Sequence, residues 1–393
     1  MISLDLAPNE GYRDALKSLA ILAQPWRWIK GQQSAKVKTK LKRLFPNHDV
    51  FLYLSARGAL YKVFQGLKLQ KGDEVAIVGF TCEAVVLPLT ELKLVPLYID
   101  VETESYSLDF ADLKRKLSTK TKAIVLQHTF GITPQYREEI LLFAKISKIP
   151  VIEDLAHGFD NSMFVKDSAD TIKLLSFGRY KALSSVFGGA LLTKDKKLQE
   201  TLKIYDKRLI TPRTSFVARC LLYKPLSVII KSTYDVALIG KALHWLSEAL
   251  HILPRELSVG EKAGQFNLQM AGLFPNAFAY LLMAQLKNLD ALQDLRKKNV
   301  GEYNDAFHST NHDQPLSRYP VLIPKRDELM LELKRKQIYL GRWYHKLVSP
   351  VGVCPVADSI KDRVINLPTH VSTKDRSVIM KQVELHAFHH QED

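Results

Sequence analysis

Two acids and a lysine are the side chains of this sequence best spaced for chemistry on a carbonyl compound. An apolar run begins at Val151 and ends in Glu153 and Asp154, and the later motif SFGRYK places Ser176 five positions before Lys181. A lysine amine can form an imine with an aldehyde. A carboxylate can hold the proton of a pyridinium nitrogen. The spacing therefore suits an aldehyde cofactor that has two anchors.

Strands that alternate with helices must position these side chains. EVAIV, CEAVVLPLTEL and LVPLYID, within residues 74–100, indicate strand, helix and strand, a pattern typical of a parallel sheet covered by helices. Residues 50–67 indicate a strand that leads into a helix. The backbone N–H groups at such a helix start form a phosphate site. Ligands of these sheets bind beyond the carboxyl ends of the strands.

In this order, Asp154, His157, Ser176 and Lys181 resemble the cofactor site of the DegT/DnrJ/EryC1/StrS family. The resemblance runs from about Phe51 to about His370, with one interrupted stretch. It implies pyridoxal 5′-phosphate (PLP) and amino transfer to nucleotide-linked keto sugars. It also implies an α/β fold of the fold type I transferases. In that fold a mixed, mostly parallel seven-stranded sheet lies between helices, and a small α+β domain follows.

The resemblance gives each of these residues a role. Lys181 is expected to bind the cofactor covalently and to carry the reacting proton, and Asp154 is expected to face the ring nitrogen. His157 is placed near the phenolic oxygen of the ring and Ser176 near the phosphate. A few relatives have histidine in place of the lysine and remove a sugar hydroxyl, so Lys181 favours amino transfer.

Further site residues are expected on weaker grounds. At the helix start after residue 54, Ala56, Arg57 and Gly58 are expected to meet the phosphate, the last two through their amides. Cys82 occupies the place where relatives often stack an aromatic side chain on the ring. The substrate-side candidates are His128, Tyr344 and His345.

The chain is expected to divide into an N-terminal helical and basic segment (1–49), a large PLP-binding domain (50–270) and a linking helix with a small C-terminal domain (271–393). A single long helix is expected from residue 274 to residue 307. Two or three amphipathic helices are expected at about 211–260, where relatives are shorter and more polar. These helices suit either a dimer interface or a membrane surface. The basic run at 30–45 suits a solvated helix face or an anionic partner.

Composition limits the other possibilities. The chain has 393 residues and a formal net charge of +15, yet it carries no nucleic-acid-binding motif. Its three cysteines lack the spacing of a disulfide framework or a metal site, which favours a reducing, cytoplasmic setting. The N-terminus does not resemble a secretory signal, and no run of residues is long and apolar enough to span a membrane.

The leading hypothesis is therefore a PLP-dependent aminotransferase that acts on a nucleotide-linked keto sugar. Glutamate as the amino donor and a homodimer as the assembly are implied by the resemblance. Two alternatives stay open: a PLP-dependent sugar dehydratase or another PLP enzyme of the same family, and a non-catalytic regulator or assembly protein of the same fold.

Overall fold

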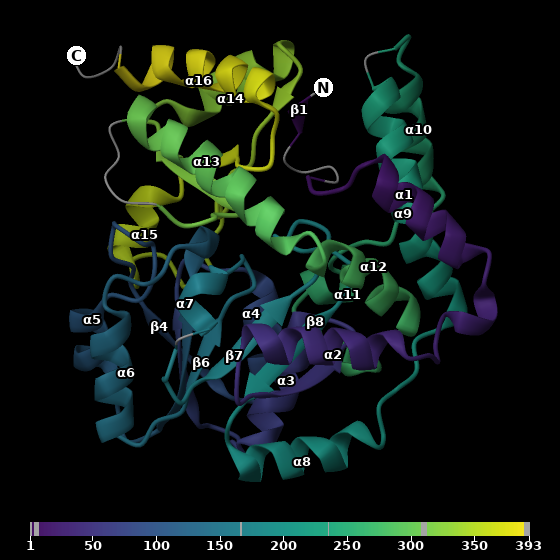
Figure 1. Cartoon of the computed structure of the whole chain (residues 1–393). Coiled ribbons are helices and arrows are strands. Elements are labelled where there is room, and N and C mark those ends of the chain that lie inside the picture. Colours follow the sequence, from purple (N-terminus) through teal and green to yellow (C-terminus); the bar gives the residue numbers. More distant parts are fainter. Residues whose placement is uncertain (1, 4–7, 166, 235, 308–312, 389–393) are drawn as a thin grey trace.

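The computed structural model describes residues 2–3, 8–165, 167–234, 236–307 and 313–388, and a seven-stranded sheet lies at its centre (Figure 1). The strand order is β2-β8-β7-β6-β5-β3-β4, and only β8 runs against its neighbours. The expected α/β fold with a mixed, mostly parallel sheet is thus confirmed. The strands are β2 (Asp49–Tyr53), β3 (Glu74–Val78), β4 (Val95–Ile99), β5 (Thr121–Gln127), β6 (Val151–Asp154), β7 (Ile172–Ser176) and β8 (Gly189–Thr193).

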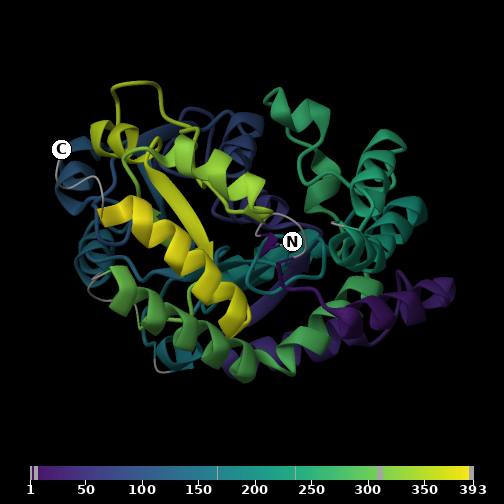
Figure 2. The same ribbon diagram turned by 90° about the horizontal axis from the view of Figure 1, so that it is seen from above.

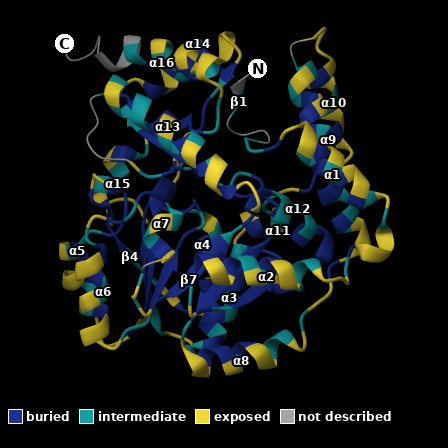
Figure 3. Ribbon diagram, viewed as in Figure 1, coloured by how far each residue is buried: buried dark blue, intermediate teal, exposed yellow. Residues whose placement is uncertain are grey.

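The central strands are buried because they are near-continuous apolar runs covered by helices on both faces. Figure 3 shows the sheet as buried and the outer faces of the helices as exposed. The strand-to-helix patterns predicted at 50–67 and 74–100 are confirmed. The helices of this part are α3 (Ala56–Gly66), α4 (Glu83–Glu91), α5 (Phe110–Lys116), η2 (Thr129–Gly131), α6 (Arg137–Ile146), α7 (Asn161–Val165) and α8 (Lys196–Asp206).

The N-terminal segment forms α1 (Tyr12–Leu22), η1 (Pro25–Arg27) and α2 (Gln33–Leu44). The predicted short helix before Pro25 is confirmed. The basic helix α2 buries Val37, Leu41 and Leu44, and Lys36 on its other side is exposed. One face of the basic run is therefore part of the hydrophobic core.

The interrupted stretch contains α9 (Thr214–Thr233), α10 (Ile239–Ala249) and the short α11 (Val259–Lys262), as the sequence predicts. Helices α1 and α10 both pack against α9. The three helices stand together at one edge of the molecule, opposite α5 and α6 (Figure 1). Within the described residues, none of the helices combines the length and the apolar character needed to cross a membrane.

The expectation of one long helix at 274–307 is wrong, because the chain breaks after Leu286. It forms α12 (Asn276–Leu286) and α13 (Leu289–Phe307), after the short turn η3 (Leu268–Ala271). The Asn288 amide bonds to the Gln285 carbonyl, which closes a tight turn in place of another α-helical turn. Helix α12 is apolar almost all round and lies within the core, whereas α13 has an exposed polar side. The change of surroundings accounts for the break.

The C-terminal part is a small α+β unit beside the sheet. Strands β9 (Arg318–Leu322) and β11 (Val364–Pro368) are antiparallel, and β1 (Ile2–Ser3) pairs in parallel with β10 (Ile338–Tyr339). Figure 2 shows this unit and the α9–α10 pair on opposite sides of the N-terminal strand. The helices of the unit are α14 (Arg326–Arg335), α15 (Pro355–Ile360) and α16 (Thr373–Phe388).

Candidate functional site

One pocket holds both principal side chains predicted from the sequence. Asp154 ends β6, Ser176 ends β7, and Lys181 lies in the turn that follows β7. All three line a single pocket at the carboxyl ends of the parallel strands, where doubly wound sheets bind ligands. Other predicted residues line the same pocket, namely Ala56, Arg57, Cys82, His157 and Tyr344.

Asp154 is a buried carboxylate with one fixed partner. Only 4% of the residue is exposed, and its Oδ1 accepts a hydrogen bond of 2.9 Å from the Ala156 amide. Burial raises the pKa of the Asp154 carboxyl, and the Ala156 amide and the charge of Lys181 oppose that rise. A cation placed beside this carboxylate would favour its ionised form. A protonated ring nitrogen is such a cation.

Lys181 presents its amine to the pocket from an anchored turn. The Lys181 amide donates to the Gly178 carbonyl at 3.2 Å, and the side-chain amide of Asn9 donates to the Lys181 carbonyl. The amine lies 4.8 Å from the centroid of the Trp343 ring. The guanidinium of Arg318 lies 3.5 Å from the same centroid. The two cationic side chains thus both contact the same indole ring.

His157 and Tyr344 form a buried pair whose proton positions follow from the backbone. The Phe130 amide donates to His157 Nδ1 at 2.8 Å, so Nδ1 must be unprotonated. A neutral imidazole then carries its proton on Nε2, which lies 2.7 Å from the Tyr344 hydroxyl oxygen. Because that oxygen accepts from His157, the Tyr344 O–H can donate to another group. Tyr344 lines the pocket, so a ligand bound there can accept this hydrogen bond.

We expect Tyr344→Phe to lower kcat about fivefold, because a single neutral hydrogen bond contributes about 1 kcal/mol. The substitution keeps the ring, which stacks on His157 and packs edge-on against Phe80. Single-turnover kinetics and the unfolding temperature measure the two effects separately. Tyr205→Phe, which removes a tyrosine hydroxyl from α8 away from the pocket, is the control and should leave the kinetics unchanged. A Tyr344→Phe enzyme with unchanged kinetics would contradict a role for the hydroxyl.

The same pair predicts a pH dependence of stability. Burial, reinforced by the charges of Lys181 and Arg318, holds the pKa of His157 well below its ordinary value. As the pH falls below about 6.5, the unfolded chain binds a proton that the folded protein does not, so the free energy of unfolding decreases. Denaturant titrations of the cofactor-free protein between pH 6.5 and 5.5 should show this loss. In His157→Gln the slope should be smaller, by up to about 1.4 kcal/mol per pH unit. An equal slope would refute the assignment.

The first turn of α3 forms the end of the pocket that suits a phosphate group. Ala56 and Arg57 begin the helix, so their amides have no acceptor within it. Strand β8 crosses close by. A side chain at Gly189 would bring its Cβ within 2.4 Å of the Ala56 nitrogen, so glycine is required there. Ala56 and Arg57 both line the pocket, so their two amides are backbone donors at this end of it.

Gly58 does not join these donors. Its amide donates to the Ser55 side chain at 3.0 Å, and Gly58 does not line the pocket. A Cβ at Gly58 would come within 1.9 Å of the Met270 carbonyl oxygen. Close packing of α3 on η3 therefore accounts for this glycine in the structure.

The Arg57 guanidinium is engaged by other groups of the protein and is not placed to bind a phosphate. Its Nε lies 2.5 Å from Glu261 Oε1, in a pair that is almost fully buried, and its Nη2 donates to the Glu256 carbonyl at 2.9 Å. These contacts join α3 to α11 and to the loop that precedes it. The Glu256 side chain itself lines the pocket. Sequence reasoning missed Glu256, because its segment was interpreted from apolar periodicity alone.

Cys82 occupies the start of α4, and its Sγ accepts from the Ala84 amide at 3.5 Å. Burial raises the pKa of the Cys82 thiol, although the charge of Lys181 acts in the opposite direction. The thiol is therefore protonated at neutral pH, which disfavours a nucleophilic role. Its side chain packs beside the pocket as a small apolar group.

Two substrate-side candidates do not reach the pocket. His128 is buried in an ion cluster, where its Nε2 lies 3.0 Å from Glu153 Oε2. Burial acts to raise the pKa of Glu153, but His128, Lys173 and Arg137 outweigh it and hold that pKa well below its ordinary value. His345 is exposed and does not line the pocket.

Thr81 and Gln127 line the pocket although the sequence analysis did not select them. The Thr81 hydroxyl donates to the Gln127 side-chain oxygen, and the Gln127 amide donates to the Thr129 hydroxyl at 2.7 Å. Both follow or end strands of the sheet, and this position was the available signal. Their mutual hydrogen bonds hold one wall of the pocket rigid.

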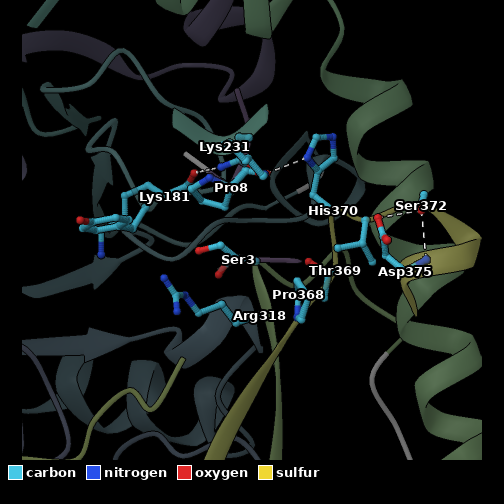
Figure 4. A pocket seen from close by; sticks show the side chains of 15 residues that line it. Ser3, Pro8, Lys181, Lys231, Arg318, Pro368, Thr369, His370, Ser372 and Asp375 are labelled. Atoms are coloured by element: carbon cyan, nitrogen blue, oxygen red, sulfur yellow. Dashed lines mark hydrogen bonds between the residues drawn. The ribbon is translucent and has the colours of Figure 1, made fainter. Parts of the chain in front are cut away.

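A second cavity, of about 160 Å³, adjoins Lys181 on the side of the C-terminal unit (Figure 4). Arg318, Lys231 and His370 line it from three separate elements. His370 Nδ1 lies 3.1 Å from the Pro8 carbonyl oxygen, which ties the N-terminal segment to this wall. The side chain of Lys181 thus lies between two cavities.

Comparisons with known proteins point to one family. The family model described as the DegT/DnrJ/EryC1/StrS aminotransferase family matches residues 12–218. GDP-perosamine synthase of Escherichia coli O157:H7 is 26% identical over 91% of this chain and 90% of its own. UDP-2-acetamido-2-deoxy-3-oxo-D-glucuronate aminotransferase of Pseudomonas aeruginosa (strain PAO1) is 33% identical over 79% of this chain and 78% of its own.

Among solved structures, Helicobacter pylori PseC, an aminotransferase involved in the biosynthesis of pseudoaminic acid, superposes with a TM-score of 0.72. It is 15% identical and covers 98% of each chain, so the likeness concerns the fold. The family model spans more than half of the sequence, including Asp154, His157, Ser176 and Lys181. This chain therefore belongs to the DegT/DnrJ/EryC1/StrS aminotransferase family.

Proposed function

We propose that this aminotransferase moves an amino group from glutamate to a keto sugar carried on a nucleotide. The aminotransferases of the family use PLP. The observation that carries the proposal is the placement of Lys181 and Asp154 on one buried pocket at the sheet edge. Two relatives that match most of this chain are named as enzymes of GDP- and UDP-linked sugars, which supports a nucleotide-linked substrate.

The groups that line the pocket match three parts of this cofactor, namely its aldehyde, its ring nitrogen and its phosphate. Lys181 offers an amine for the aldehyde, and the buried carboxylate of Asp154 offers a counter-charge for the ring nitrogen. The amides of Ala56 and Arg57, with the Ser176 hydroxyl, offer donors for the phosphate. When bound, PLP supplies an electron sink for the bond broken at the substrate carbon. Lys181 then moves the proton at that carbon.

Other residues can orient the bound groups and exclude water from them. The Tyr344 hydroxyl can donate into the pocket because His157 Nε2–H occupies its oxygen. Leu174, Val186 and Phe187 form an apolar wall that limits water near the reacting groups. Arg318 is a buried cation that contacts the Trp343 ring, as the Lys181 amine does, and it lines the second cavity together with Lys181. A cation there suits the carboxylate of an amino-acid donor, which supports glutamate.

We extend the proposal to a cytoplasmic homodimer. The free thiols of Cys82, Cys220 and Cys354 support a reducing compartment. The homodimer is an expectation from the family resemblance.

The proposal is tested in two half-reactions. Purified protein loaded with PLP is mixed with glutamate, and conversion to the pyridoxamine form is followed by absorbance. That form is then offered GDP- and UDP-linked keto sugars, with the free sugars as controls, and products are identified by mass. Aminated nucleotide sugar is the expected product. A dehydrated sugar, or PLP binding without turnover of any sugar, would replace the proposal with one of its alternatives.

A further inference from the structure

Helix α10 is amphipathic in the reverse sense of an ordinary surface helix. Its buried residues are the small ones, Gly240 and Ser247. Most of its large apolar residues face outward, with Trp245 71% exposed and Leu250 62% exposed, whereas Leu243 is half-buried against the core. Leu246 and Ile239 are also exposed on this helix. Surface helices of globular proteins normally turn this face to the core.

Close packing fixes this orientation. A Cβ at Gly240 would approach the Ile230 carbonyl oxygen to 2.4 Å and Tyr234 Cα to 2.5 Å, so α9 and α10 touch at the glycine. The Ser247 hydroxyl is satisfied within the helix by the Leu243 carbonyl at 2.6 Å. A rotation of α10 about its axis that buried Trp245 would place a bulky ring where α9 and α10 now touch at Gly240. The outward apolar face is thus built into the packing of α10 on α9.

Helix α1 adds a second outward apolar stripe on the same edge. Tyr12, Leu16 and Leu19 recur with helical spacing and are exposed, Tyr12 by 71%. The opposite side packs on α9, where the Ser18 hydroxyl donates to the Leu221 carbonyl at 2.6 Å. Trp26 follows in η1 and is 73% exposed. We call these exposed residues of α1, η1 and α10 the apolar edge; the helices α1 and α10 lie at the same edge of the molecule (Figures 1 and 3).

Basic residues accompany the apolar edge. Residues 12–30 and 236–255 together contain six lysines and arginines but only Asp14 and Glu248 as acids. The lysines and arginines are Arg13, Lys17, Arg27, Lys30, Lys241 and Arg255. An exposed apolar face with tryptophan and an excess of basic residues in the same segments is the composition of helices that lie in the interface of an anionic bilayer.

A second copy of this chain fits the apolar edge less well. A two-fold contact places the same patch of both copies face to face. The excess of positive charge would then meet itself, and like charges across an interface disfavour association. An anionic surface has the complementary charge, and the formal net charge of +15 on the whole chain acts in the same direction.

We propose that the apolar edge docks this protein on an anionic membrane surface, with Trp26 and Trp245 inserted at the level of the lipid headgroups. The contact is peripheral. Its chemistry is independent of the aminotransferase site, because none of these residues lines the pocket of Lys181 and Asp154.

Co-sedimentation of the full chain with vesicles tests the proposal. Vesicles of phosphatidylcholine alone are compared with vesicles that contain about a third phosphatidylglycerol. The protein should pellet with the anionic vesicles and much less with the neutral ones, and 0.5 M NaCl should release part of it, because salt screens surface charge. Trp245→Ser should weaken the partition constant about tenfold. Combined Lys17→Glu and Lys241→Glu should weaken it at least as much.

Helix α6 offers matched controls on the opposite edge. Leu142 is 61% exposed and Lys145 is exposed, so Leu142→Ser and Lys145→Glu make the same changes away from the apolar edge. These variants should pellet like the parent, and unfolding temperatures verify that every variant is folded. Absence of binding to anionic vesicles, or equal losses in the α6 variants, would overturn the proposal. So would conversion of a dimer to a monomer by Trp245→Ser, since the face would then join two copies.

Discussion

Replacing Lys181 with alanine is expected to abolish the covalent attachment of PLP and to lower the transamination rate by about 10⁴-fold or more. The variant loses the amine that binds the aldehyde and also the group that moves the proton. No other lysine lines the pocket among the described residues, so none is placed to substitute. Borohydride treatment followed by peptide mass analysis should locate a reduced adduct on Lys181 in the parent and none at this site in the variant.

Lys207→Ala is the matched control for this experiment. Lys207 is exposed at the end of α8, away from the pocket, and its removal should change neither the adduct nor the rate. A Lys181→Ala protein that still formed a reducible adduct on another pocket residue would show that the anchor is misassigned. A variant that bound no adduct but kept the parent rate would remove Lys181 from the reaction.

The strands and their polar ends were predictable because their signal is local. Asp154 and Ser176 end apolar runs, and in a parallel sheet such ends meet at one edge. The pairing of His157 with Tyr344 was not predictable, since 187 residues separate them and only the fold brings them together. The break between α12 and α13 has the same origin. The local pattern continues through residue 287, but the surroundings of the two helices differ.

In two parts of the pocket, the sequence motif could not assign roles that the backbone structure does assign. The motif predicted one shared role for Ala56, Arg57 and Gly58. In the structure the Gly58 amide donates to the Ser55 side chain that caps the helix, so only the amides of the first two residues are available to a ligand. Glu256 enters the pocket from the loop after α10. A loop residue in an apolar segment has no periodicity to mark it, so only the tertiary structure could place it.

Asp154→Asn is expected to lower kcat by about 10²- to 10⁴-fold, with little loss of stability or of PLP affinity. The amide side chain keeps the size of Asp154 and an oxygen that can accept from the Ala156 amide. It lacks the charge that stabilises a protonated ring nitrogen, and that charge acts in a buried site where water screens it weakly. Because burial raises the pKa of the Asp154 carboxyl in the cofactor-free protein, the neutral amide should be tolerated in folding.

Rapid mixing of the PLP-loaded variant with glutamate isolates the half-reaction in which the charge acts. The parent should complete it quickly and Asp154→Asn slowly, while both bind PLP with similar affinity. Asp170→Asn, at an exposed aspartate that precedes β7, makes the same chemical change away from the pocket and should match the parent. If Asp154→Asn kept the parent rate, the carboxylate would not act on the ring nitrogen. If instead the variant lost PLP binding alone, Asp154 would hold the cofactor without activating it.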